Sequence, residues 1–136
     1  MNTKSLMTLS AIILALIGIS LNFFPKEILD YLELSVSDTL ELLMQIIGSL
    51  YFAFAMLNWM SKGSLIGGIY GRPIAIANLT HFVIAGLSLI KGIMANSGLS
   101  YVIWSIAIIY SIFAIFFGIV AFKHPCLLYT SPSPRD

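Results

Sequence analysis

The stretch that decides the fold is "LSYVIWSIAIIYSIFAIFFGIVAF", residues 99–122, in which no side chain carries a charge. A helix needs roughly 20 mostly apolar residues to cross a hydrocarbon core of about 30 Å. Lipid cannot satisfy open backbone polar groups, and the strands of a membrane barrel would alternate in hydropathy, which this stretch does not. It therefore predicts a membrane-spanning helix.

Three further stretches have the same length and character. They are residues 5–24 "SLMTLSAIILALIGISLNFF", 40–60 "LELLMQIIGSLYFAFAMLNWM" and 73–94 "PIAIANLTHFVIAGLSLIKGIM". Only Glu41 and Lys91 are charged within the spans, and each lies near an end. A chain of 136 residues that is 59% hydrophobic could not bury so much apolar surface in water. We predict an all-α membrane protein, an antiparallel four-helix transmembrane bundle that forms one domain over residues 1–125.

The first span and the connection that follows it each allow two interpretations. No small-residue cleavage site follows the first span, so we expect a retained helix and not a signal peptide. The connection "PKEILDYLELSVSD", residues 25–38, carries acidic side chains but spaces its apolar residues as a helix would. It is either a short interfacial helix on the outer surface or an irregular acidic loop.

The end of the chain, "CLLYTSPSPRD", shares nothing with the rest. Pro132 and Pro134 forbid a continuing helix. The segment resembles the translation of a transposon-type sequencing adapter over all of residues 126–136. That resemblance implies an artefactual tail, so Cys126 carries no functional claim and the native C-terminus is not given by this sequence.

The distribution of basic residues predicts the orientation, since cytoplasmic loops are enriched in Lys and Arg. Lys26 and Lys91 fall on one side of the membrane. The other side holds four basic residues, namely Lys4, Lys62, Arg72 and Lys123. We therefore expect both termini in the cytoplasm, and we expect the bacterial inner membrane as the location.

Each span has a stripe of small and polar residues at helical spacing, and such stripes let membrane helices approach closely. In chain order the stripes are Ala11, Ala15, Gly18 and Asn22; Gly48, Tyr51, Ala55 and Asn58; Asn78, His81, Ala85, Ser88 and Gly92; and Ala107, Ser111, Ala114 and Gly118. We expect the stripes to face inward. The short linker between the second and third spans makes those two spans expected neighbours.

The polar members of the stripes fall at two depths. With a rise of about 1.5 Å per residue, Tyr51, His81 and Ser111 lie roughly 13–18 Å below the cytoplasmic edge. Asn58 and Asn78 lie roughly 6–9 Å below it. We predict one polar layer near the midplane and a second one nearer the cytoplasm.

His81 is an ionisable residue well inside a span, which makes it a candidate functional residue. We expect a neutral imidazole hydrogen-bonded to Tyr51 or Ser111, holding helices together. Proton or substrate handling in a small transporter is an alternative, although no carboxylate lies near the midplane to assist it. A haem, quinone or metal ligand role is a third, but His124 lies at the membrane edge and no Cys, Asp or Glu lies at mid-depth.

Other classes of function lack a sequence signal. There is no Ser-His-Asp set and no pair of carboxylates at useful depth, so we expect no enzyme, no cofactor and no metal. The net charge of +1 gives no reason to expect nucleic acid as a partner.

The segments "YFAFAMLNWM" and "GRPIAIANLTHFVIAGLSLIKG" resemble small uncharacterised bacterial membrane proteins, distantly those of the DoxX-like group, over about residues 40–91. That resemblance implies four helices and a membrane redox partner near quinone, and it assigns no functional residue. Our leading hypothesis is an integral inner-membrane accessory or interaction subunit, with the lipid bilayer and a redox enzyme or a second copy as partners. The alternative is a small proton-coupled transporter that uses His81, Tyr51 and Asn78.

Overall fold

The computed structural model describes residues 3–63 and 71–122. The helices are α1 (Thr3–Phe23), α2 (Pro25–Tyr31), α3 (Asp38–Ser61), α4 (Arg72–Ala95) and α5 (Tyr101–Phe122). The four long helices match the predicted spans to within two residues at each end, and no strand occurs in the described ranges. The predicted all-α, four-helix architecture is confirmed.

Local signals explain where the helices begin. The Ser37 hydroxyl accepts a hydrogen bond from the Leu40 amide at 3.3 Å, which caps the start of α3. Asp38 and Glu41 follow in the first turn, where the helix dipole favours negative charge. A proline occupies the first turn of both α2 and α4, where its missing amide costs nothing.

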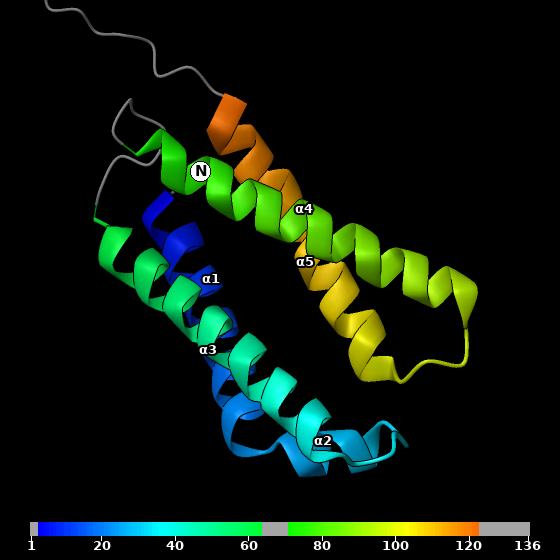
Figure 1. The fold of residues 1–136 in the computed structure, drawn as a ribbon. Coiled ribbons are helices and arrows are strands. Elements are labelled where there is room, and N and C mark those ends of the chain that lie inside the picture. Colours follow the sequence, from blue (N-terminus) through cyan, green and yellow to red (C-terminus); the bar gives the residue numbers. More distant parts are fainter. Residues whose placement is uncertain (1–2, 64–70, 123–136) are drawn as a thin grey trace, which may run out of the picture.

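The long helices run antiparallel and pack as two pairs, α1 along α3 and α4 along α5 (Figure 1). The pairs lie close together where α1 begins, α3 ends, α4 begins and α5 ends, which we call the closed end. They diverge toward the opposite end (Figure 1). The expected contact between the second and third spans is therefore made by side chains near the closed end, while α3 packs most extensively on α1.

The connection between α1 and α3 contains a helix, as the first of our two interpretations expected. The side chain of Leu29 in α2 is buried, whereas Val36, which also fits the helical spacing, is exposed in the following loop. At the end of α2, the Ser100 hydroxyl donates a hydrogen bond of 3.2 Å to the Tyr31 hydroxyl. The helix α2 thus links the first pair to the start of α5 at the diverging end.

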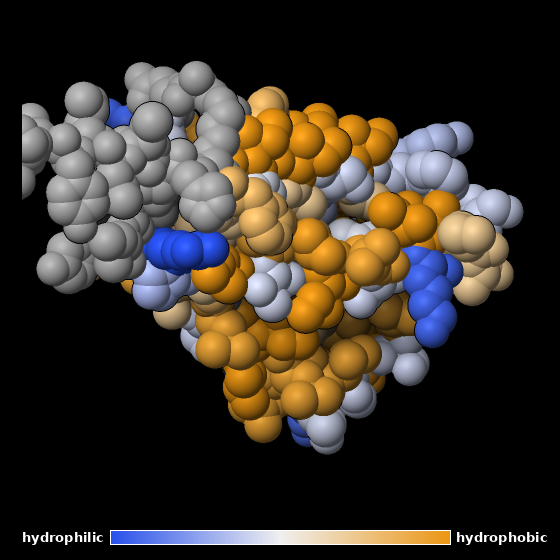
Figure 2. Space-filling model, turned by 90° about the horizontal axis from the view of Figure 1, so that it is seen from above, coloured by the Kyte–Doolittle hydropathy of each residue, from blue (hydrophilic) through white to orange (hydrophobic). Residues whose placement is uncertain are grey.

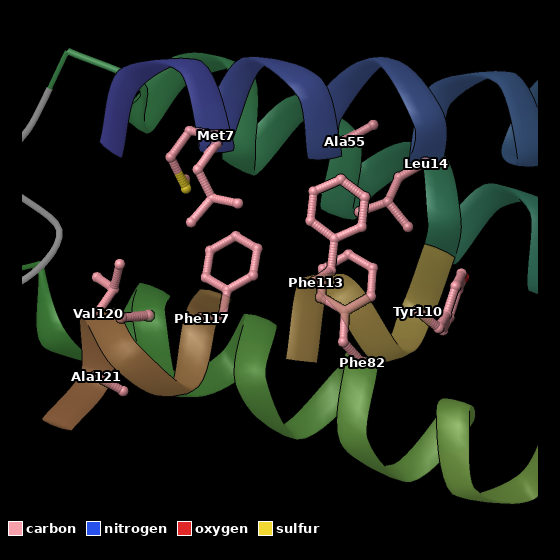
Figure 3. Packing of buried hydrophobic residues seen from close by; sticks show 11 residues of the cluster. Met7, Leu14, Ala55, Phe82, Tyr110, Phe113, Phe117, Val120 and Ala121 are labelled. Atoms are coloured by element: carbon pink, nitrogen blue, oxygen red, sulfur yellow. The ribbon is translucent and has the colours of Figure 1, made fainter. Parts of the chain in front are cut away.

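Aromatic rings join the two pairs. Phe82 of α4 stacks on Phe113 and Phe117 of α5, with ring centroids 4.8 and 5.5 Å apart. The three rings meet Met7 and Leu14 of α1 across the interface (Figure 3). The fourth span therefore buries its aromatic face most deeply, and its predicted stripe from Ala107 to Gly118 is only partly inward.

Large apolar side chains are exposed on all four long helices, and they occupy much of the face seen in Figure 2. Examples are Leu16 at 62% exposure, Leu50 at 64% and Ile115 at 64%. All four long helices have the length and hydropathy to cross a bilayer. Such a surface would be costly in water and suits contact with lipid, so the chain is a multi-pass membrane protein.

The sequence predictions for Lys123, His124 and residues 126–136 lie outside the described residues. Two predicted inward positions of the third span are wrong. A Cβ atom at Gly92 would meet nothing within 4 Å. Ser88 is exposed, and its hydroxyl donates to the Ile84 carbonyl of its own helix. Helical Ser side chains can satisfy themselves in this way and then need no neighbouring helix.

Candidate functional site

A saturated polar cluster lies near the closed end. Asn58 of α3 and Asn78 of α4 exchange two hydrogen bonds, each amide nitrogen donating to the other residue's carbonyl oxygen at 2.7 Å. Asn58 Nδ2 also donates to the Ser10 hydroxyl of α1 at 3.0 Å. All three side chains have no exposed surface. The cluster therefore ties three helices together inside the membrane.

The remaining hydrogen-bonding groups of this cluster also have partners. Asn78 Nδ2 donates its second hydrogen to the Ile74 carbonyl at 2.9 Å, and the Ser10 hydroxyl donates to the Met7 carbonyl at 3.0 Å. No donor remains free on either carboxamide. Interhelical polar contacts of this kind contribute roughly 0.6–2 kcal/mol each in membranes. The cluster is suited to holding helices and has no donor left for a substrate.

The helical repeat places these residues at one level. Ser10 begins the third turn of α1, Asn78 is in the second turn of α4, and Asn58 is in the last turn of α3. Because the helices alternate in direction, these positions meet at the same end of the molecule. Sequence reasoning missed Ser10, although its six-residue distance from Lys4 gives roughly 9 Å, the depth derived for Asn78.

A second cluster surrounds His81, one turn further along α4. Four rings contact the imidazole, with centroids 5.2–5.6 Å away: Tyr51 and Phe54 from α3, Phe82 from α4, and Tyr110 from α5. The Phe54 ring stacks on it at 26° and the Tyr51 ring meets it at 80°. We call these five residues the aromatic box. It lies between the two helix pairs.

The aromatic box contains two buried polar atoms without a partner among the described residues, His81 Nε2 and Tyr110 Oη. The hydrogen bond expected from His81 to Tyr51 or Ser111 is therefore not made by Nε2. The physical reason is packing: ring faces and edges enclose the imidazole, so its neighbours touch it mainly through carbon. Tyr110, which is 1% exposed, was missed by sequence reasoning because its neighbour Ser111 fitted the small-residue stripe.

Ser111 lies apart from the expected midplane layer. Its hydroxyl donates to the Ala107 carbonyl of α5 at 2.8 Å. Its side chain lines an apolar groove of about 380 Å³ between α4 and α5, together with residues such as Ile90 and Trp104. Positions 110 and 111 differ by about 100° around a helix axis, so only one of them can face the box. The structure turns Tyr110 inward.

Metal chemistry finds no grouped ligands here: within residues 3–63 and 71–122, no three His, Cys, Asp or Glu side chains gather. The polar residues of the aromatic box are instead an imidazole and two phenols. Comparisons of the chain with protein-family models, with curated proteins and with solved structures found no match.

Proposed function

We propose that this protein is an accessory or interaction subunit of the bacterial inner membrane, without an enzymatic activity of its own. The observation that carries the proposal is the saturated cluster of Ser10, Asn58 and Asn78. Exposing these polar side chains to lipid would be costly. Their hydrogen bonds instead join the helices to one another. Such a rigid core suits a protein that presents a membrane surface to a partner.

The proposed orientation places the closed end in the cytoplasm. Lys4, Lys62 and Arg72 lie at that end, whereas Lys26 and Lys91 lie at the diverging end. The Lys62 ammonium lies 3.0 Å from the centroid of the Trp59 ring, an arrangement that suits a membrane–water interface. This supports both termini being cytoplasmic.

The proposed partner is a second copy of the chain or a membrane redox enzyme, the latter on the DoxX-like resemblance alone. The test is crosslinking in intact bacterial membranes, followed by isolation in mild detergent. We expect either a dimer by light scattering or a co-isolated enzyme that has a haem difference spectrum or extractable quinone. Repeated isolation of an uncrosslinked monomer would contradict the proposal.

A second candidate function is a small proton-coupled transporter, favoured by the two polar atoms in the aromatic box that lack protein partners. His81 and Tyr51 are both only partly buried, so part of the box is exposed at the surface of the helices. In this function His81 would accept and release protons. Asn78, assigned to this role from the sequence, is hydrogen-bonded throughout and would only position α4.

Proton flux separates the two functions. Liposomes that contain the purified protein and a trapped pH-sensitive dye are given a pH gradient, with His81→Phe as the test variant. Transport predicts flux above that of empty liposomes and at least a tenfold loss in the variant. Thr80→Ala, which alters the exposed neighbour of His81, is the matched control and should leave the flux unchanged.

A further inference from the structure

Two unpaired polar atoms in one buried box require an explanation. His81 Nε2 comes from α4 and Tyr110 Oη from α5, and their ring centroids are 5.6 Å apart. Buried polar groups in folded proteins nearly always have a partner, which is either protein or ordered water. Inside a membrane the need is greater, because lipid offers no hydrogen bond.

The chemistry of the two groups limits what can lie between them. A neutral imidazole nitrogen donates or accepts according to its tautomer, while a phenol does both. A water molecule can match either tautomer, since it also donates and accepts. Buried water needs at least two polar partners. The box supplies these two atoms, and the Tyr51 hydroxyl lies close to that of Tyr110.

We propose that His81 Nε2 and Tyr110 Oη bind one water molecule inside the aromatic box, joining α4 to α5. The side chains of Tyr51 and His81 are partly exposed, so the box is not closed on every side. The proposal concerns the same histidine as the transport function but does not depend on transport. The tests of the water site measure melting temperature and hydration, whereas the test of transport measures proton flux.

The sign of a stability change tests the proposal first. If Tyr110 Oη is truly unpaired, Tyr110→Phe removes a desolvated hydroxyl and should leave the melting temperature unchanged or raise it. If water bridges it to His81, the same variant should lower the melting temperature in detergent by roughly 2–5 °C. The matched control is Tyr101→Phe, which removes a phenol hydroxyl from an 89% exposed residue of the same helix. It should have no effect.

A double-mutant cycle tests the link between the two atoms. With a bridging water, His81→Phe and Tyr110→Phe should be non-additive, and the double variant should melt close to the less stable single variant. Additive effects would contradict the bridge.

Hydration of the unaltered protein gives a test that does not depend on any variant folding. In micelles, the ring protons of His81 should show a nuclear Overhauser contact to a water resonance. A lower melting temperature of Tyr110→Phe without this contact would indicate a direct bond from the Tyr110 hydroxyl to His81 or to the neighbouring Tyr51 hydroxyl, and it would overturn the proposal. An unchanged or raised melting temperature would overturn it as well.

Discussion

A carboxamide inside a membrane helix needs partners for both its oxygen and its amino group, and Asn58 and Asn78 meet this need for each other. Their reciprocal arrangement leaves no group unpaired in an apolar setting. His81 and Tyr110 show the opposite case, because ring packing encloses them and leaves one polar atom of each without a protein partner. At the scale of single residues, the first cluster is suited to stability and the second to binding a small polar molecule.

Replacing one member of the Asn pair should destabilise the protein more than replacing both. Asn78→Leu leaves the buried Asn58 carboxamide without its hydrogen-bond partner. We therefore expect a loss of about 1–3 kcal/mol in the free energy of unfolding. The double variant Asn58→Leu with Asn78→Leu should recover part of this, since no buried carboxamide then lacks a partner. The measurement is thermal or denaturant unfolding in micelles.

The control for this pair is Gln45→Leu, a similar change at an exposed position of α3. It should be close to neutral. A double variant that loses the sum of both single effects would show that the two residues do not act as a pair.

At the scale of helices, the backbones of α1 and α3 approach each other closely. A Cβ atom at Gly18 would lie 2.8 Å from both the Gly48 carbonyl oxygen and the Phe52 amide nitrogen. A Cβ atom at Gly48 would lie 2.8 Å from the Gly18 carbonyl oxygen. Because these neighbours are backbone atoms, they cannot move aside by rotating a side chain. The two glycines set the separation of the first helix pair.

Gly18→Ala should therefore force α1 and α3 apart. We expect a loss of about 1–3 kcal/mol in stability, as for other overpacked cores. Gly92→Ala is the matched control, since nothing lies within 4 Å of an added Cβ there. Alanine favours a helix over glycine by roughly 0.5–1 kcal/mol, so this control should be neutral or stabilising. Equal effects of the two variants in micelles would contradict the close approach.

At the scale of the whole molecule, two helix pairs share a narrow zone of contact. Phe82, Phe113 and Phe117 fill it from the second pair, and Met7 and Leu14 meet them from the first (Figure 3). The polar cluster lies in the same zone near the closed end. The pairs diverge beyond it (Figure 1), so this zone and the Tyr31–Ser100 hydrogen bond at the diverging end fix their relative position.

Phe117→Ala should loosen the two pairs. We expect a destabilisation below the roughly 3–5 kcal/mol typical of soluble cores, because lipid tails are as apolar as the lost contacts. Distances between spin labels on α3 and α4 should broaden at the diverging end. Phe116→Ala, at a 39% exposed neighbour, should change neither the distances nor the stability.

The orientation of the whole chain has its own test. With Cys126 replaced by Ser, single cysteines are introduced at Glu27 and at Gly63, both exposed and at opposite ends of the molecule. A membrane-impermeant maleimide should label Glu27→Cys in intact spheroplasts and Gly63→Cys only after lysis. The reverse pattern would place both termini outside.

The sequence by itself determined the four spans to within two residues, because length and hydropathy act locally and lipid demands a closed helix. It also placed Asn58 with Asn78 and Tyr51 near His81, since depth along a helix follows from residue counting. Only the tertiary structure decided how each helix is rotated about its axis and which helices pair. Those choices turned Tyr110 inward in place of Ser111, and they brought Ser10 to the Asn pair. They depend on side chains from several helices packing at once, which no single span encodes.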